Sequence, residues 1–288
     1  MKAGFIGLGQ QGKYLAINLA EAGHDLMVYD VRREPLEELA RAGATIADSR
    51  RAIGRHAEVI AICVLDDAQL EAVVFGPKGV LAAAAPGTVV VIHSTVEPSY
   101  IAKIGEAAAP LKIEVVDAPV SGGEPGAKGK TMSYMVGGSD EAVDRCLPLF
   151  RTSGRSITRT GPAGSGIRAK LAHQLIVCIN MLAAYEGMRL GREAGLPSAI
   201  LEQVVHEGGA QSRIADHRSQ LSLRSATPVF FKDLQICLKF AHQLGLSVPG
   251  AALVQQITRT NSAAPRVADL REERAHCRNS DSLNLLLS

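Results

Sequence analysis

One lysine stands where a glycine-rich turn meets a long apolar segment. Gly164 and Gly166 precede Lys170, and the apolar run 175–182 follows it. The glycines allow close packing of the backbone, and the run favours a buried helix. Burial lowers the pKa of a lysine, and a lysine that is neutral part of the time can exchange a proton with a hydroxyl or carbonyl oxygen. The alternative is a surface lysine whose stem covers apolar surface while its ammonium group reaches water.

A second motif lies near the N-terminus, where Gly7, Gly9 and Gly12 form a GxGxxG pattern between a predicted strand and a predicted helix. The first glycine permits a tight turn, the second clears space for a pyrophosphate, and the third allows the helix to pack on the strand. The helix N-terminus presents free N–H groups to the anion. A glycine-rich turn without a ligand is the alternative, and the flanking elements make it the less favoured one. The residues expected to bind a dinucleotide here are Gly7, Leu8, Gly9, Gln10, Gln11 and Gly12.

Asp30 follows the second predicted strand, close to the position about 20 residues past the glycines that is expected of a ribose-binding acid. A carboxylate there accepts hydrogen bonds from ribose hydroxyls and repels a 2′-phosphate, which favours NAD. Arg32 and Arg33 favour NADP instead, because guanidinium groups pair with phosphate, or they simply begin a solvated helix. We therefore expect Asp30, Val31 and Arg32 to contact NAD or NADP, with NAD favoured.

The elements that must position these residues alternate up to about residue 163. Short β-branched runs separate segments of helical period, which predicts a mostly parallel sheet covered on both faces. The strands expected are 3–6, 25–29, 58–64, 88–93, 113–117 and 132–136. The helices expected include 12–22, 35–42, 98–108 and 140–150.

Beyond residue 164 the strand pattern stops. Residues 166–194 predict one long, mostly apolar helix that ends near Gly195 and Pro197, and further helices are expected at 199–207, 232–244 and 251–260. We therefore expect a doubly wound α/β domain of Rossmann type at 1–163, followed by an all-helical domain at 164–288. The long helix joins the two and, being apolar round most of its circumference, must be buried between domains or against another subunit.

Composition narrows the class of protein. The chain has 288 residues, 47% hydrophobic and 21% charged, with a net charge of +2, so nothing indicates a nucleic-acid surface. Its five cysteines are dispersed, without a metal-binding pair, and are interpreted as reduced core residues; no metal is expected. The N-terminal apolar stretch is too short for a signal peptide, and no apolar window is expected to reach the length of a membrane span. These features predict a cytoplasmic protein.

Three further segments carry a family resemblance. They are His93-Ser-Thr95-Val-Glu-Pro98, Asp117-Ala-Pro-Val-Ser121-Gly122-Gly123, and Gly164-Ser-Gly166-Ile-Arg-Ala-Lys170. With the glycine motif and Lys232-Asp233-Leu234, they resemble the β-hydroxyacid dehydrogenase family over roughly residues 1–255. That family includes 3-hydroxyisobutyrate dehydrogenase, tartronate semialdehyde reductase, glyoxylate/succinic semialdehyde reductase and, more distantly, 6-phosphogluconate dehydrogenase.

The resemblance implies an NAD(P)-dependent enzyme that interconverts a small β-hydroxy acid and its semialdehyde or oxo acid. It implies Lys170 as the general acid/base, and a loop of Ser121, Gly122 and Gly123 that holds the substrate carboxylate. It places Leu65 and Thr95 beside the nicotinamide, and Lys232 and Asp233 as a pair that closes the site from the helical domain. A homodimer or homotetramer, packed through the helical domains, is also implied.

Several positions depart from the family pattern. Gln174 stands where an asparagine usually binds substrate, and His173 precedes it, as either a structural residue or a further contact. Segment 222–233 is shorter than in similar sequences, and Phe230 and Phe231 stand directly before Lys232. The resemblance ends near Arg259, so that 259–288 is atypical. Two alternative functions stay open: an imine-reductase-like enzyme, against which Lys170 argues, and a non-catalytic dinucleotide-binding protein.

Overall fold

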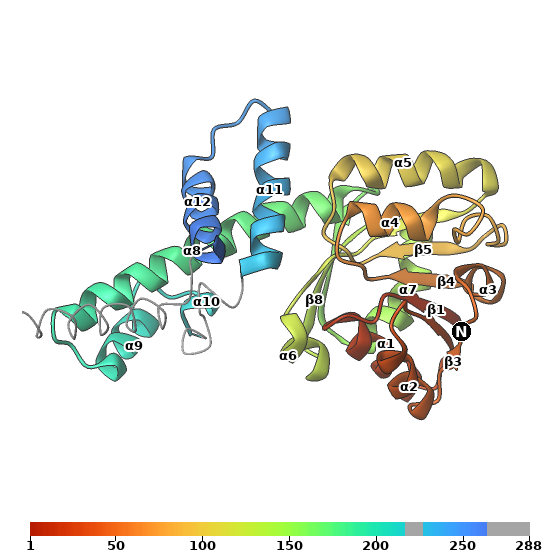
Figure 1. Ribbon diagram of the computed structural model, residues 1–288, viewed down its shortest axis with the longest axis horizontal. Helices are drawn as coiled ribbons and strands as arrows, with labels where there is room; N and C mark the ends of the chain where they lie inside the picture. The colour runs from red at the N-terminus through yellow and green to blue at the C-terminus, as the bar shows by residue number, and fades with distance from the viewer. Residues whose placement is uncertain (217–226, 264–288) are drawn as a thin grey trace, which may run out of the picture. The chain divides into compact units, whose positions relative to one another are not determined.

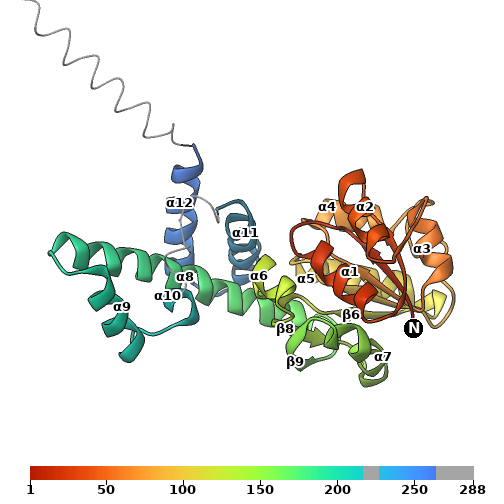
Figure 2. The same ribbon diagram turned by 90° about the horizontal axis from the view of Figure 1, so that it is seen from below.

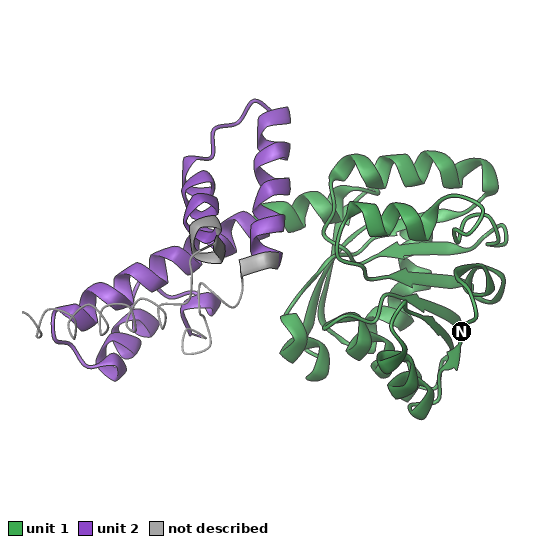
Figure 3. Ribbon diagram, viewed as in Figure 1, with its two compact units in different colours: residues 1–173 green, residues 174–288 purple. Residues whose placement is uncertain are grey.

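The computed structural model describes residues 1–216 and 227–263, which divide into two compact units (Figure 3). The first unit is residues 1–173, and the second begins at residue 174. The first is a sheet covered by helices and the second is helical, so the predicted fold class is confirmed.

A nine-stranded sheet forms the centre of the first unit, in the order β3-β2-β1-β4-β5-β6-β8-β7, and β9 pairs with β8 (Figure 1). The strands from β3 to β6 in this order are parallel, whereas β8 is antiparallel to β6 and β7. The bounds are β1 Lys2–Ile6, β2 Asp25–Tyr29, β3 Thr45–Ile46, β4 Val59–Ile62, β5 Val89–Ile92, β6 Glu114–Asp117, β7 Val120–Ser121, β8 Met132–Gly137 and β9 Gly154–Gly161.

Side-chain alternation along the central strands builds a core on each face of this sheet. In β4, Val59 and Ala61 join one cluster of buried residues, while Ile60 and Ile62 join the other, as the period of two in a strand requires. Helices α1, α2, α6 and α7 cover the first cluster, and α3, α4 and α5 cover the second (Figure 2). Their bounds are α1 Gly12–Glu21, α2 Arg33–Arg41, α3 Arg50–His56, α4 Asp67–Val74, α5 Pro98–Ala108, α6 Gly123–Lys128 and α7 Asp140–Arg151, with the short 3-10 helix η1 at Ala109–Leu111.

Strand register aligns the carboxyl ends of five parallel strands. The last residues of these strands form one row across the sheet: Tyr29, Ile6, Ile62, Ile92 and Asp117. The residues that follow each strand therefore emerge at one edge. Ligands of doubly wound sheets bind at this edge.

Helix α8, Ser165–Glu193, begins in the first unit and continues into the second. The second unit adds α9 Ser198–Glu207, α10 Arg213–Asp216, α11 Thr227–Gln243 and α12 Pro249–Ala263. Among its described residues, one core cluster contains Cys178, Met181, Leu182, Leu234, Ala251 and Val254. Close approach within this unit uses glycines: a Cβ on Gly191 would lie 2.4 Å from a methyl group of Leu201 on α9.

Some expectations from the sequence need correction, and others concern segments that lie largely outside the described residues. Strand β9 was not predicted, because most of its side chains are exposed and its sequence is polar. By length and composition, α8 could cross a membrane, contrary to the expectation that no window would. Core helices of soluble proteins share this length and composition. Most of the atypical segment 259–288 and much of 222–233 lie outside the described residues.

Candidate active site

The glycine motif has the geometry of a ligand-binding turn. Gly7 has φ 93°, and a Cβ there would lie 2.3 Å from the carbonyl oxygen of Cys63. A Cβ on Gly12 would lie 2.1 Å from the carbonyl oxygen of Gly7, whereas a Cβ on Gly9 would meet nothing within 4 Å. The outer glycines are thus required by packing, and the middle one borders open space. Helix α1 has no side-chain N-cap and no acid in its first turn, so its N-terminus suits a pyrophosphate.

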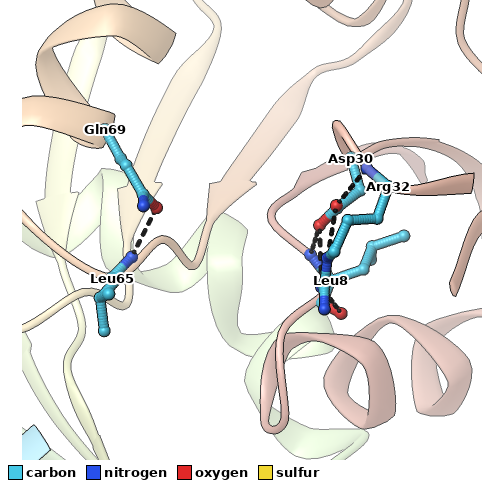
Figure 4. Close-up of polar contacts among 5 residues, drawn as sticks. All are labelled: Leu8, Asp30, Arg32, Leu65 and Gln69. Carbon is cyan, nitrogen blue, oxygen red and sulfur yellow. Dashed lines mark hydrogen bonds and ion pairs between the residues drawn. The ribbon is translucent and has the colours of Figure 1, made fainter. Parts of the chain in front are cut away.

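Asp30 and Arg32 are bound to each other and to the glycine motif (Figure 4). The backbone N–H of Leu8 donates to Asp30 Oδ2 at 2.6 Å, and Arg32 donates to Asp30 Oδ1 through its backbone N–H at 2.8 Å and through Nε at 3.1 Å. Arg32 Nη2 also donates to the carbonyl oxygen of Leu8 at 2.8 Å. Burial raises the pKa of Asp30, but the hydrogen bonds from Arg32 and Leu8 outweigh it and lower that pKa below its ordinary value. Asp30 is therefore a carboxylate at neutral pH. The side chain of neighbouring Val31 is 90% exposed.

Leu65 and Thr95 follow β4 and β5 at the same edge of the sheet. The Leu65 backbone N–H donates to Gln69 Oε1 at 3.1 Å, and its side chain is 53% exposed (Figure 4). The loop after β4 is joined to the loop after β5, because Val64 N–H donates to Ser94 Oγ at 2.9 Å. An exposed leucine at this edge offers an apolar surface to a flat ring.

The segment predicted to hold a carboxylate follows β6. Ser121 ends β7, and Gly122 and Gly123 have φ 141° and 63°, conformations that L side chains rarely adopt. A Cβ on Gly122 would also lie 2.8 Å from Met132 Sδ. Both glycines are therefore required by the backbone, and they follow Ser121 directly in the chain.

Lys170 is 6% exposed, so it is not the surface lysine of the alternative reading. Its Nζ donates to the carbonyl oxygen of Val120 at 2.8 Å, directly beside Ser121. His173, one turn further along α8, brings Nε2 to 3.4 Å from Ser121 Oγ. The predicted lysine and the predicted carboxylate loop thus meet within the first unit, and His173 is a contact that the sequence left undecided.

The remaining predicted residues form a cluster inside the second unit. Gln174, on α8, donates from Nε2 to Asp233 Oδ2 at 2.6 Å, and Asp233 Oδ1 lies 2.8 Å from Lys232 Nζ. Gln174 and Asp233 are buried, while the Lys232 side chain is 20% exposed. Phe230 packs against the core of this unit. Among residues 1–216 and 227–263, no group of three His, Cys, Asp or Glu side chains is arranged to hold a metal ion.

Two buried groups at this edge were missed as site residues. Asp117 is fully buried beside the start of α8, and His93 is 3% exposed beneath the segment that follows β6. Both belong to motifs that carry the family resemblance, but each stands at the end of a predicted strand, where a buried side chain is expected for packing alone. Pairing across the sheet, which the sequence does not reveal, is what brings them together.

Comparisons with known proteins identify the family of the chain. A family model described as the NAD binding domain of 6-phosphogluconate dehydrogenase matches residues 2–161. A second, described as NAD-binding of NADP-dependent 3-hydroxyisobutyrate dehydrogenase, matches residues 164–271.

Individual relatives point the same way. The chain is 36% identical to 2-hydroxy-3-oxopropionate reductase of Escherichia coli over 91% of its own length and 92% of that protein. It is 37% identical to the NAD-dependent L-serine dehydrogenase of Pseudomonas aeruginosa over 70% and 67% of the two chains. The crystal structure of a 3-hydroxyisobutyrate dehydrogenase from Salmonella typhimurium matches with a TM-score of 0.80 and 29% identity, covering 90% of this chain and 93% of that one. The chain therefore belongs to the β-hydroxyacid dehydrogenase family of NAD(P)-dependent oxidoreductases.

Proposed function

We propose that this enzyme interconverts a small β-hydroxy acid and its semialdehyde or oxo acid, with Lys170 as general acid/base. The observation that carries the proposal is the 2.8 Å hydrogen bond from buried Lys170 Nζ to the carbonyl oxygen of Val120, next to Ser121. This hydrogen bond places the Lys170 amine, which can transfer a proton, next to the loop of Ser121, Gly122 and Gly123, which is suited to hold a carboxylate.

The bound nicotinamide supplies the hydride acceptor in oxidation and the hydride donor in reduction. The glycine turn of Gly7, Gly9 and Gly12, with the N-terminus of α1, would hold its pyrophosphate. Asp30, Val31 and Arg32 would contact the adenosine ribose, and Leu65 and Thr95 would line the nicotinamide side. Leu8, Gln10 and Gln11 complete the proposed loop.

In the oxidation direction, neutral Lys170 takes the hydroxyl proton as the C–H bond gives up its hydride. In the reduction direction, the ammonium form donates that proton and stabilises the negative charge that develops on the carbonyl oxygen. The Ser121 hydroxyl and the N–H groups of Gly122 and Gly123 hold the carboxylate, which fixes the reacting carbon relative to Lys170. Gln174 remains our prediction for a substrate contact, and Lys232 and Asp233 for cofactor contacts.

NAD is the proposed cofactor in preference to NADP. Asp30 is a buried carboxylate at the end of β2, where the 2′ position of the adenosine ribose is expected. Its negative charge would repel a 2′-phosphate. Arg32, the group that could compensate, is already paired with Asp30 and with the Leu8 carbonyl.

We also propose a homodimer or homotetramer assembled through the helical unit, and a cytoplasmic enzyme. Large apolar side chains are exposed on this unit, which favours an interface. They include Ile176, Tyr185, Leu190, Leu196, Ile200, Val204, Leu244, Leu246 and Leu253. We place the functional domain boundary between residues 163 and 164, where one family match has ended and the next begins.

A substrate panel tests the function. Nicotinamide absorbance would be followed with 3-hydroxyisobutyrate, glycerate, L-serine, tartronate semialdehyde, glyoxylate and succinic semialdehyde, each with NAD(H) and NADP(H), and with a cyclic imine as comparison. We expect turnover of at least one carboxylate-bearing alcohol or aldehyde and none of the imine. A folded protein that binds the cofactor but turns over none of the panel would contradict the proposal and support the binding-protein alternative.

A further inference from the structure

The segment 117–121, between β6 and the proposed carboxylate loop, is held by its neighbours along its length. Ala118 N–H donates to the carbonyl oxygen of Ile92 at 2.8 Å, and its own carbonyl accepts from His93 Nδ1 at 2.7 Å. The carbonyl of Pro119 accepts from Met135 N–H at 3.1 Å. Hydrogen bonds from the end of β5 and from β8 hold the segment on both sides. A side chain or helix that is bonded to this segment is therefore fixed relative to the sheet.

The Asp117 carboxylate attaches this segment to the first turn of α8. Its Oδ1 accepts from Gly164 N–H and its Oδ2 from Ile167 N–H, both at 2.6 Å. These are charge-assisted bonds to N–H groups that a helix cannot satisfy internally. The side chain is fully buried, so water cannot take its place.

Glycines make this attachment possible. A Cβ on Gly166 would lie 2.5 Å from the carbonyl oxygens of Asp117 and Met135, and a Cβ on Gly137 would lie 2.6 Å from Asp117 Oδ1. Helix α8 therefore starts directly against the backbone of β6 and β8. Gly166 is therefore required because a side chain would not fit at this contact, and not only because glycine makes the turn flexible.

The same segment receives Lys170 one turn later. Ile167, which donates to Asp117, lies about 4.5 Å along the helix axis from Lys170, which donates to the carbonyl oxygen of Val120. Two points on α8 are thus fixed to two points on one short segment. A shift of the first turn would move Lys170 Nζ relative to Ser121, Gly122 and Gly123.

We infer that Asp117 is a positioning residue for the reaction: its carboxylate fixes the start of α8 and thereby sets where Lys170 Nζ lies relative to the carboxylate loop. This inference rests on the proposed function, since it assigns Asp117 a role through Lys170. Because Asp117 is fully buried, we assign it no contact with substrate or cofactor.

Protonation provides an independent readout. Loss of water raises the pKa of Asp117 to about 6, opposed by the hydrogen bonds from Gly164 and Ile167 and by the charge of Arg168. Arg168 on α8 is the charged group that acts on it, and the Ser165 hydroxyl, which pairs with Thr160, lies beside it at Gly137. The titratable groups on the neighbouring elements are Lys170 on α8, which contacts Val120, and His93 directly after β5, which contacts Ala118. Below about pH 6 one carboxylate oxygen becomes a hydroxyl that donates, so one of the two amide bonds is lost. Activity is expected to fall as the pH drops through this value.

The test compares Asp117→Asn with Ser139→Ala, which removes the N-cap of α7 at a helix outside the proposed site. Asparagine keeps one acceptor but turns an N–H group toward the other amide. We expect kcat to fall about 10- to 100-fold in Asp117→Asn, with the KM for the cofactor within about twofold and the acid limb near pH 6 lost. In hydrogen exchange, peptide 164–171 should lose protection in Asp117→Asn and keep it in Ser139→Ala, whose kcat should match wild type.

A cooperatively folded Asp117→Asn with wild-type kcat, pH profile and exchange would overturn the inference. If the variant does not fold, the exchange of peptide 164–171 in wild type at about pH 5 and pH 7.5 replaces it, after correction for intrinsic rates. Equal protection at both pH values would overturn the inference, and lower protection at pH 5 would support it. Absence of turnover in wild type would instead contradict the proposed function, while the exchange data still decide whether Asp117 holds α8.

Discussion

At the scale of single residues, the proposed chemistry depends on where each lysine lies. Lys170 is buried and donates to the carbonyl oxygen of Val120, next to Ser121, whereas Lys232 pairs with Asp233 inside the helical unit. Its position beside the proposed carboxylate loop is the reason for assigning the proton transfer to Lys170.

Cofactor choice is a residue-scale prediction. Asp30→Asn removes the charge that would face a 2′-phosphate, so we expect the ratio of kcat/KM for NADP to that for NAD to rise about tenfold or more, equivalent to about 1.4 kcal/mol. Arg32→Ala should lower the same ratio. Arg33→Ala is the matched control, because Arg33 is exposed and pairs with Glu37. Unchanged ratios in both Asp30→Asn and Arg32→Ala would show that another group selects the cofactor.

Carboxylate recognition gives a second residue-scale prediction. Ser121→Ala deletes one proposed hydrogen bond to a charged group, which is worth about 1.5–3 kcal/mol. We expect kcat/KM for the carboxylate-bearing substrate to fall by about tenfold to a hundredfold. The weaker turnover of a matched aldehyde without the carboxylate should not change. An equal loss for both aldehydes would indicate that Ser121 acts on the reacting carbon or on folding.

At the scale of elements, the sequence predicted the longer parallel strands β1, β2, β4, β5 and β6 to within two residues, because buried strands leave apolar β-branched runs. It did not predict the parallel strand β3, which has only two residues. It could not predict the pairing. Strand β9 is polar, β7 has two residues, and the antiparallel placement of β8 depends on contacts across the sheet. Lys170 and Ser121 could be named from motifs, but their contact through Val120, and the role of Asp117 between them, required the register of β6 and the start of α8.

The carboxyl end of β5 offers an element-scale prediction about stability. Burial lowers the pKa of His93 from 6.5 to about 4, despite its bond to Ala118. Between these values the unfolded chain binds more protons than the folded one, so His93 makes the free energy of unfolding fall as the pH drops, by about 3 kcal/mol in total. The raised pKa of Asp117 has the opposite sign between about pH 6 and pH 3.8.

The variant His93→Gln isolates this effect. Glutamine does not titrate, so the decrease in unfolding free energy between about pH 7 and pH 5 should be about 2 kcal/mol smaller than in wild type. Urea denaturation at both pH values measures it. The same pH dependence in both proteins would mean that His93 is protonated normally in the folded state.

At the scale of the whole molecule, exposed apolar surface on the helical unit predicts self-association. Leu190 and Val204 are 74% and 63% exposed, so charges there should oppose an interface that buries them. We expect wild type to be a dimer or tetramer by light scattering, and Leu190→Glu/Val204→Glu to dissociate. Leu111→Glu, at an exposed leucine of the first unit, is the control and should not dissociate. A wild type that stays monomeric at tens of micromolar would contradict the prediction.

The central claim is that Lys170 moves the proton, and one comparison tests it most directly. Turnover of the best panel substrate and the Kd for the cofactor would be measured on the same preparations of wild type and Lys170→Met, which keeps a similar apolar stem. General acid/base catalysis contributes about 10²–10⁴-fold, so we predict a loss of kcat in that range with the cofactor Kd within about twofold. A Lys170→Met enzyme with wild-type kcat would show that the proton is transferred elsewhere, and the proposed mechanism would be wrong.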